Sequence, residues 1–211
     1  MSKTTIPTGG IADDAINLTS KVTGTLPVAN GGTALTSGTS GQFLKFTGTT
    51  TLASASGGIT EADMWRVTSG FSSTTDPIAN NWERVDDASF NKIGTGMSQS
   101  SGIFTFPSTG IYKITFAVSA YKNGDDRTIT KRVYTTLNNS SYTEHSSADV
   151  SVSGVQSNNT HSSAFNEIYF DVTDTSNCKI KFAYYTNNSS TYYTTSSYLL
   201  SHVAFIRMGD T

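Results

Sequence analysis

The sequence predicts an all-β protein, and three observations support this fold class. Ser, Thr, Asn and Gly dominate the 211 residues, of which only 14% are charged. The aromatic residues are mainly Phe and Tyr, with 11 and 10 copies, and such residues favour strands. Runs that alternate apolar and polar residues are separated by polar turn clusters at the spacing of about 8–12 residues that is typical of a β-sandwich.

The aromatic residues also divide the chain near residue 60. Neither Trp nor Tyr occurs before Trp65, whereas all 10 Tyr and both Trp follow. Residues 1–59 therefore cannot build a large core alone, and we expect them to be extended. Residues 60–211 are expected to form a compact head of about eight to ten strands, which suits a jelly roll.

Two interpretations remain open for residues 1–59. One is a flexible linker, and the other is a fibre shaft in which three copies wrap together and bury their aliphatic side chains. A plain Gly/Ser linker needs no Ile, Leu or Val, so the shaft is favoured. The aliphatic residues concerned are Ile6, Ile11, Ile16, Leu18, Val22, Leu26 and Val28.

The clearest strand signal covers residues 111–119, directly after the turn cluster Pro107–Gly110. Alternation predicts a core face made of Tyr112, Ile114, Phe116 and Val118, with the opposite face toward solvent or a second subunit. Further strands are expected over residues 102–106, 128–137, 165–172, 179–186 and 199–208, and weaker ones near 65–67, 82–85 and 90–93.

The single cysteine carries no predicted chemistry. Cys178 excludes an internal disulfide and a Cys-pair zinc site within one chain. Alternation places it on the same face as Ile180 and Phe182, which predicts a buried structural thiol rather than a nucleophile.

We predict no catalytic residue, no cofactor and no metal site. The three histidines, His145, His161 and His202, have no second His or Cys at metal-ligand spacing. No Gly-x-Ser-x-Gly, P-loop or His-Glu-x-x-His motif occurs. The pair Asp125–Asp126 lies in an oxygen-rich loop of a kind that can hold calcium, but without EF-hand spacing a solvated turn is the favoured interpretation.

The charge pattern bears on two classes of partner. The formal charge is −2, and Lys and Arg are scattered singly, so the sequence offers no basic stripe for nucleic acid. No apolar run approaches the ~20 residues that span a bilayer, and Met1-Ser2-Lys3 leads into no signal-peptide core. We expect synthesis in a host cytoplasm and no membrane insertion.

The head resembles a known family. Gly102–Pro107 followed by Gly110–Phe116 resembles the signature hairpin of C1q/TNF-like heads, and Tyr198–Arg207 resembles their final strand. The resemblance covers about residues 60–211 and implies a jelly roll that assembles as a homotrimer.

The N-terminal part resembles a different group of proteins. Gly24–Thr33 and Gly10–Ile16 are similar to segments that recur in tailed-phage fibres and marine-phage structural proteins. The collagen-like Gly-x-y stalk of C1q itself is absent, which argues against an animal secreted protein. The two resemblances together imply a virion fibre, on the tail or the capsid surface, with a C1q/TNF-like head.

Receptor contact is expected from exposed tyrosines and from loops. Tyr combines a rigid apolar ring with a hydroxyl group and suits stacking on sugars. Strand tyrosines are also ordinary packing residues, and alternation would send about half of them inward. The candidates are Tyr184, Tyr185, Tyr192 and Tyr193 around the turn at residues 187–190, and Asn123, Asn139 and Asn188 in the tip loops.

The combined interpretation is a non-enzymatic fibre or spike. Residues 1–59 would join other tail or capsid proteins, and the trimeric head would bind a glycan or protein of the host surface. The alternative is a capsid decoration or particle-joining protein with no receptor role. A polysaccharide-degrading tailspike is disfavoured, because such enzymes need paired catalytic carboxylates and charged residues are scarce here.

Overall fold

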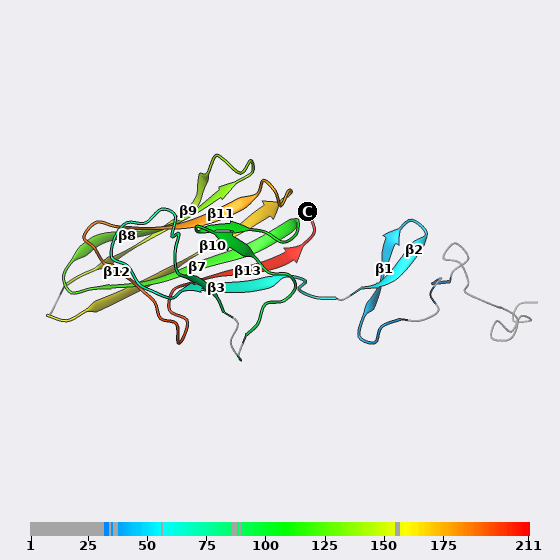
Figure 1. Ribbon diagram of the computed structural model, residues 1–211, viewed down its shortest axis with the longest axis horizontal. Coiled ribbons are helices and arrows are strands. Elements are labelled where there is room, and N and C mark those ends of the chain that lie inside the picture. Colours follow the sequence, from blue (N-terminus) through cyan, green and yellow to red (C-terminus); the bar gives the residue numbers. More distant parts are fainter. Residues whose placement is uncertain are drawn as a thin grey trace, which may run out of the picture. The chain divides into compact units, whose positions relative to one another are not determined.

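The computed structural model describes residues 32–33, 35, 38–55, 57–85, 88, 90–154 and 157–211. The aliphatic residues assigned above to a shaft lie outside these ranges. The chain divides into two compact units, Met1–Gly58 and Ile59–Thr211. Every regular element of the described residues is a strand, which confirms the all-β class (Figure 1). None of these residues forms a helix that could cross a membrane.

The first unit contains a hairpin that the sequence pattern did not lead us to expect. Its strands are β1 (Phe43–Gly48) and β2 (Thr51–Ala55), which run antiparallel. The Thr/Gly-rich composition of this region hides the strands, because only four large apolar residues mark them. They are Phe43, Leu44, Phe46 and Leu52.

The second unit, the head, is a sandwich of two antiparallel sheets. The six-stranded sheet has the order β10 (Thr160–Val172), β7 (Gly110–Lys122), β13 (His202–Gly209), β3 (Ala62–Val67) and β4 (Trp82–Arg84), and β12 (Thr191–Tyr193) also pairs with β7. The five-stranded sheet has the order β5 (Ser98–Ser100), β6 (Ile103–Thr105), β11 (Lys179–Thr186), β8 (Asp126–Thr136) and β9 (Thr143–Val152). The chain passes repeatedly from one sheet to the other, so strands far apart in the sequence, such as β3 and β13, pair within one sheet, as in a jelly roll.

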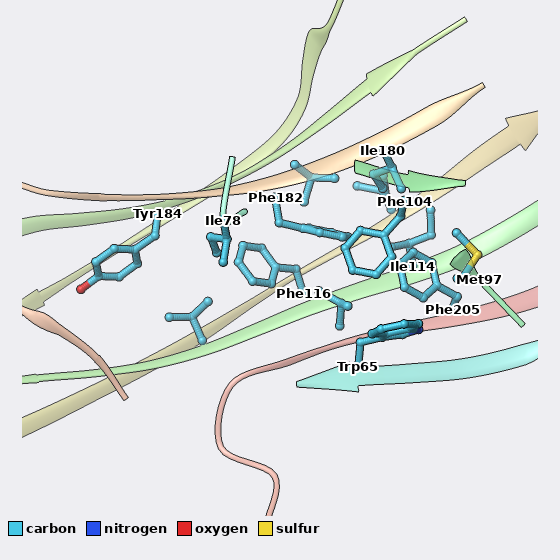
Figure 2. Packing of buried hydrophobic residues seen from close by; sticks show 14 of the residues in the cluster. Trp65, Ile78, Met97, Phe104, Ile114, Phe116, Ile180, Phe182, Tyr184 and Phe205 are labelled. Atoms are coloured by element: carbon cyan, nitrogen blue, oxygen red, sulfur yellow. The ribbon is translucent and has the colours of Figure 1, made fainter. Parts of the chain in front are cut away.

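Aromatic side chains from both sheets fill the space between the layers (Figure 2). The Phe104 ring is central, since its centroid lies 5.6 Å from those of Trp65 and Phe182 and 5.4 Å from that of Phe205. Such edge-on and tilted contacts add about 0.5–1.5 kcal/mol per pair beyond the burial of apolar area. The head is therefore held by an aromatic core rather than by disulfides.

The burial pattern tests the sequence predictions directly. The inward face of β7 is buried as predicted, and Tyr112, Ile114, Phe116 and Val118 form it. Cys178 is fully buried beside Ile180 and Phe182, which confirms a packed thiol.

The predicted strands recur with three additions and one correction. Those near residues 65–67, 82–85, 102–106, 128–137, 165–172, 179–186 and 199–208 overlap β3, β4, β6, β8, β10, β11 and β13. The strand expected at residues 90–93 is wrong, because there only a single bridge joins Ile93 to Ala62. Strands β5, β9 and β12 were not expected, since β5 and β9 are mostly polar and β12 is only three residues long.

Candidate functional site: the outward face of the six-stranded sheet

The outward face of β10, β7 and β13 is the most unusual surface of the head. Strand pairing arranges its side chains in three rows. These rows are Phe165–Ala117–His202, Glu167–Thr115–Ala204 and Tyr169–Lys113–Ile206. We call these nine residues the assembly face.

Two large aromatic side chains stand exposed on the assembly face. Phe165 is 67% exposed and Tyr169 is 56% exposed, although both lie on a long strand of the sheet. Beside them, Ala117 and Ala204 leave the middle of the sheet low, because their side chains are single methyl groups. The surface thus combines projecting rings with a neighbouring shallow trough.

The charges on the assembly face are largely paired. Lys113 Nζ lies 2.9 Å from Glu167 Oε2, so neither group requires a partner from another molecule. On β3, next to His202, Arg66 Nε lies 3.1 Å from Glu83 Oε2. A second protein surface could therefore cover this face without burying an unpaired charge from these pairs.

An aromatic cluster continues the same sheet face beyond these rows. Ring centroids of Tyr121 and His161 lie 5.3 Å apart, and those of Tyr121 and Tyr193 lie 5.1 Å apart. A hydrogen bond between the Tyr193 and Tyr198 hydroxyls raises the pKa of Tyr193. Sequence reasoning named Tyr193 but missed Tyr121 and His161, which only the pairing of β7 with β10 and β12 brings together.

Two of the predicted contact residues require correction. Tyr184 and Tyr192 are fully buried, so neither can touch a receptor. Their rings meet edge-on at 5.4 Å, and Phe71 stacks on Tyr192 at 4.8 Å. Burial raises the pKa of both hydroxyls. Of each adjacent pair of tyrosines, one is therefore part of the core, as alternation suggested, while Tyr185 and Tyr193 face outward.

Asn123 and Asn188 lie together at one end of the head. Asn188 Nδ2 donates to the Asp125 carbonyl oxygen at 2.6 Å. Asp126 fixes the adjoining turn, since its Oδ2 accepts from Thr186 Oγ1 at 2.6 Å. It also accepts hydrogen bonds from the Ser190 hydroxyl and amide and from the Asn188 amide.

These contacts bear on the calcium site considered for this loop. The oxygens of Asp126 already accept several donors, so they are not arranged around a cation. Within the described residues no three His, Cys, Asp or Glu side chains gather at metal-binding distance. An open hollow of about 560 Å³ lies beside the loop and is lined by Asp125, Asp126, Arg127, Ser151, Val152 and Ser153.

Asn139 lies at the other end of the head. Its amide donates to the Asn177 carbonyl oxygen at 2.9 Å, near the start of β7 and the end of β13. The structure therefore brings Asn123 and Asn188 together but separates them from Asn139.

Tyr185 belongs to a different surface, the outward face of the five-stranded sheet. There its hydroxyl donates to Asp76 Oδ2 at 2.7 Å, and the Arg132 guanidinium lies 4.7 Å from its ring centroid. Lys181 Nζ lies 2.8 Å from Asp76 Oδ1 and 4.9 Å from the Tyr134 ring centroid. Cationic side chains thus lie over the tyrosine rings. The charged groups named here already have partners within the same face.

Comparison with known proteins identifies the fold. No protein-family model and no curated protein matches the sequence. Among solved structures, murine APRIL aligns with a TM-score of 0.52 at 14% identity, over 70% of this chain and 98% of that one. Eiger TNF from S. frugiperda aligns with a TM-score of 0.54 at 13% identity, over 71% and 93%. At this identity the similarity shows a TNF-like jelly roll and nothing about activity.

Proposed function

We propose that the chain is a trimeric structural protein of a virus particle that acts as a fibre or spike. In this proposal residues 1–59 attach to tail or capsid proteins, and the head contacts the host surface. The TNF-like jelly roll supports the head, and the similarity of Gly24–Thr33 to phage-fibre segments supports the virion location. The proposed role needs no catalytic residue and no cofactor.

The observation that carries the proposal is the assembly face. The exposed rings lie on β10 and the alanine trough lies beside them on β7 and β13. One copy can therefore place its Phe165 over Ala117 and Ala204 of the next copy. Contacts of this head-to-tail kind close into a ring when the rotation permits. The assembly face therefore fits a threefold ring better than the charged face around Lys181 and Arg132 does.

The chain path suggests which end of the head meets the host. The head begins at Ile59, and Ala62 pairs with Ile206, at the end of the sheet where β7 begins. The end that carries Asn123 and Asn188 lies opposite, at the far end of β7. A head attached through its N-terminal unit would present this far end to the host.

In a trimer, each head would need only a weak affinity for the host surface. Each head would offer one set of polar loops around Asn123 and Asn188, held by the Asp126 hydrogen bonds. Three sites on one rigid support can raise the overall affinity by about 10²-fold or more when the geometry allows simultaneous contact. A glycan or a protein of the host surface is the partner class that we propose.

Two experiments test the proposal. Light scattering after size exclusion should give three times the chain mass, and a monomer would overturn the trimer. The purified chain should then compete with its virus for host cells, and an excess that leaves infection unchanged would overturn the receptor role. Labelling of the chain on the capsid rather than at the tail, without competition, would favour a decoration protein.

A further inference from the structure

We infer that the β1–β2 hairpin is a second assembly element, in which copies of this chain pack one face of their hairpins against each other. The inference rests on the proposed trimer, but it concerns a part of the chain outside the jelly roll. Murine APRIL and Eiger TNF align with 70% and 71% of this chain, a share close to that of the head alone.

One face of the hairpin is apolar and open. Residues that pair directly across antiparallel strands share a face. Phe46 pairs with Leu52, and Leu44 pairs with Ser54, so these four side chains lie together. Phe46 is 64% exposed and Leu44 is 53% exposed. We call Leu44, Phe46, Leu52 and Ser54 the hairpin face.

The opposite side of the hairpin differs in chemistry. It carries Lys45, whose partner is Ala53, and Phe43, whose partner is Ala55. The chain itself approaches Phe43 there, because a Cβ atom added to Gly57 would lie 2.4 Å from the Phe43 ring, and the rest of the Phe43 side chain is open, at 69% exposure. The hairpin face carries no charged residue, and the described chain approaches it at Ser54, where a Cβ atom added to Gly38 would lie 3.6 Å from Ser54 Oγ. Its one polar contact is the Thr39 amide donating to Ser54 Oγ at 3.4 Å.

A hairpin of this kind needs cover. An isolated two-stranded hairpin is at best marginally stable in water, and a third layer or strand is usually required. Exposing Leu44 and Phe46 adds a cost of roughly 1.5–3 kcal/mol for each large side chain that stays in water rather than being buried. Packing against a partner would remove this cost.

Other copies of the same chain are the partner that the sequence and the structure favour. Between Ala55 and Ala62 the chain can span at most about 25 Å, so a trimeric head would hold three hairpins close together. Tethering over such a short distance gives effective concentrations in the millimolar range. Because the hairpin face is uncharged, identical copies would not repel each other.

Cysteine cross-linking in the full chain tests the inference. Leu52→Cys places a thiol on the hairpin face. The matched control Ala53→Cys places one at the next residue, on the opposite face of the hairpin. The native Cys178 is fully buried and stays out of the reaction. Mild oxidation should give disulfide-linked chains for Leu52→Cys and far fewer for Ala53→Cys. Equal cross-linking of the two variants would overturn the inference.

The mass of the same samples separates the two proposals. A chain that is trimeric by light scattering but does not cross-link through Leu52→Cys would overturn the hairpin inference alone, and the face would then be open to another virion protein. A chain that is monomeric would overturn the proposed trimer itself. The two failures are therefore distinguishable in one set of samples.

A second pair of variants measures the contribution of the face. The double variant Leu44→Ser with Phe46→Ser should raise the concentration at which the trimer dissociates by at least about tenfold, which corresponds to 1.4 kcal/mol. Lys45→Ser, between them on the opposite side, should leave that concentration unchanged. An unchanged dissociation concentration for the double variant would also overturn the inference.

Discussion

Phe165 on β10 pairs directly with Ala117 on β7, so an exposed phenyl ring stands next to a methyl group on the same sheet face. The pair is a projection beside a depression. A flat polar sheet face offers no such shape, and a core face would not leave a ring 67% exposed. The ring of one copy and the methyl groups of another could therefore form a contact between identical chains.

Phe165→Asp should convert the proposed trimer to monomers while leaving the head folded. A carboxylate placed against the alanine trough of a neighbouring copy would lose its water without gaining a partner, a cost of several kcal/mol. Light scattering gives the mass, and far-ultraviolet circular dichroism checks the fold. Leu137→Asp is the control, because Leu137 is 66% exposed but lies outside the assembly face. Loss of the trimer in both variants would argue against a specific contact at Phe165.

The strands that could be predicted from the sequence are those with one apolar face and one polar face. In β7 every second residue from Tyr112 to Val118 is large and apolar, so Tyr112 and Phe116 could be placed in the core from spacing alone. Strand β9 could not be recognised, because it lies at the edge of its sheet and exposes most of its polar residues. Its pairing with β8 is decided by the tertiary structure rather than by its own composition.

The candidate site was less predictable because it depends on contacts between distant residues. Alternation implied that one tyrosine of each adjacent pair faces inward, but it could not say which. The choice follows from Phe71, which stacks on Tyr192 from more than a hundred residues earlier in the chain. The exposed ring of Phe165 could have been suspected, since it lies out of phase with Ile168 and Phe170 on the same strand.

Asp126→Asn should destabilise the head at neutral pH and reduce its sensitivity to acid. Burial alone would raise the pKa of Asp126, but hydrogen bonds from Thr186 and Ser190 outweigh burial and lower it below 3.8. The stabilisation is therefore present above the unfolded pKa and is lost as the pH falls through the lower folded pKa.

The measurement for Asp126 is thermal unfolding between pH 3 and pH 7. The wild type should lose more stability than Asp126→Asn as the pH drops below about 4. Asp174→Asn is a useful comparison, because Asp174 is exposed and its pKa is lowered by bonds within one short turn. Parallel pH curves for wild type and Asp126→Asn would contradict the assigned role.

His202 should make the head less stable in mild acid. Burial lowers the pKa of His202 below 6.5, and its Nδ1 is buried without a hydrogen-bond partner among the described residues. The unfolded chain therefore binds a proton more readily, and stability is lost as the pH falls below about 6.5. The new charge would also lie beside the Arg66–Glu83 pair of β3 and β4, next to the assembly face.

His202→Gln should remove this part of the pH dependence. The unfolding midpoint of the wild type is expected to fall between pH 7 and pH 5, and that of His202→Gln to fall less. His161→Gln serves as control, since His161 is exposed on the same side of the sheet. An equal decrease in the wild type and His202→Gln would assign the acid sensitivity to other groups.

Lys131→Met should stabilise the head. Lys131 faces inward on β8 between Ile129 and Val133, is fully buried, and its Nζ has no hydrogen-bond partner among the described residues. Leaving such a polar group unpaired costs about 1–3 kcal/mol, whereas Met fills a similar volume without this cost. The burial of Lys131 could not be predicted from the sequence, because lysine is almost never fully buried.

The pH dependence provides an independent check on Lys131. Burial lowers the pKa of its amine to about 8, from 10.5, so the unfolded chain holds more protons between these values and wild-type stability should rise with pH across that window. Lys131→Met should lack this rise and unfold at a higher temperature at pH 7. Lys179→Met should instead be destabilised, because Lys179 Nζ donates to the Thr175 carbonyl oxygen at 2.6 Å. A lower unfolding temperature for Lys131→Met would mean that the amine has a stabilising partner in solution, such as a buried water.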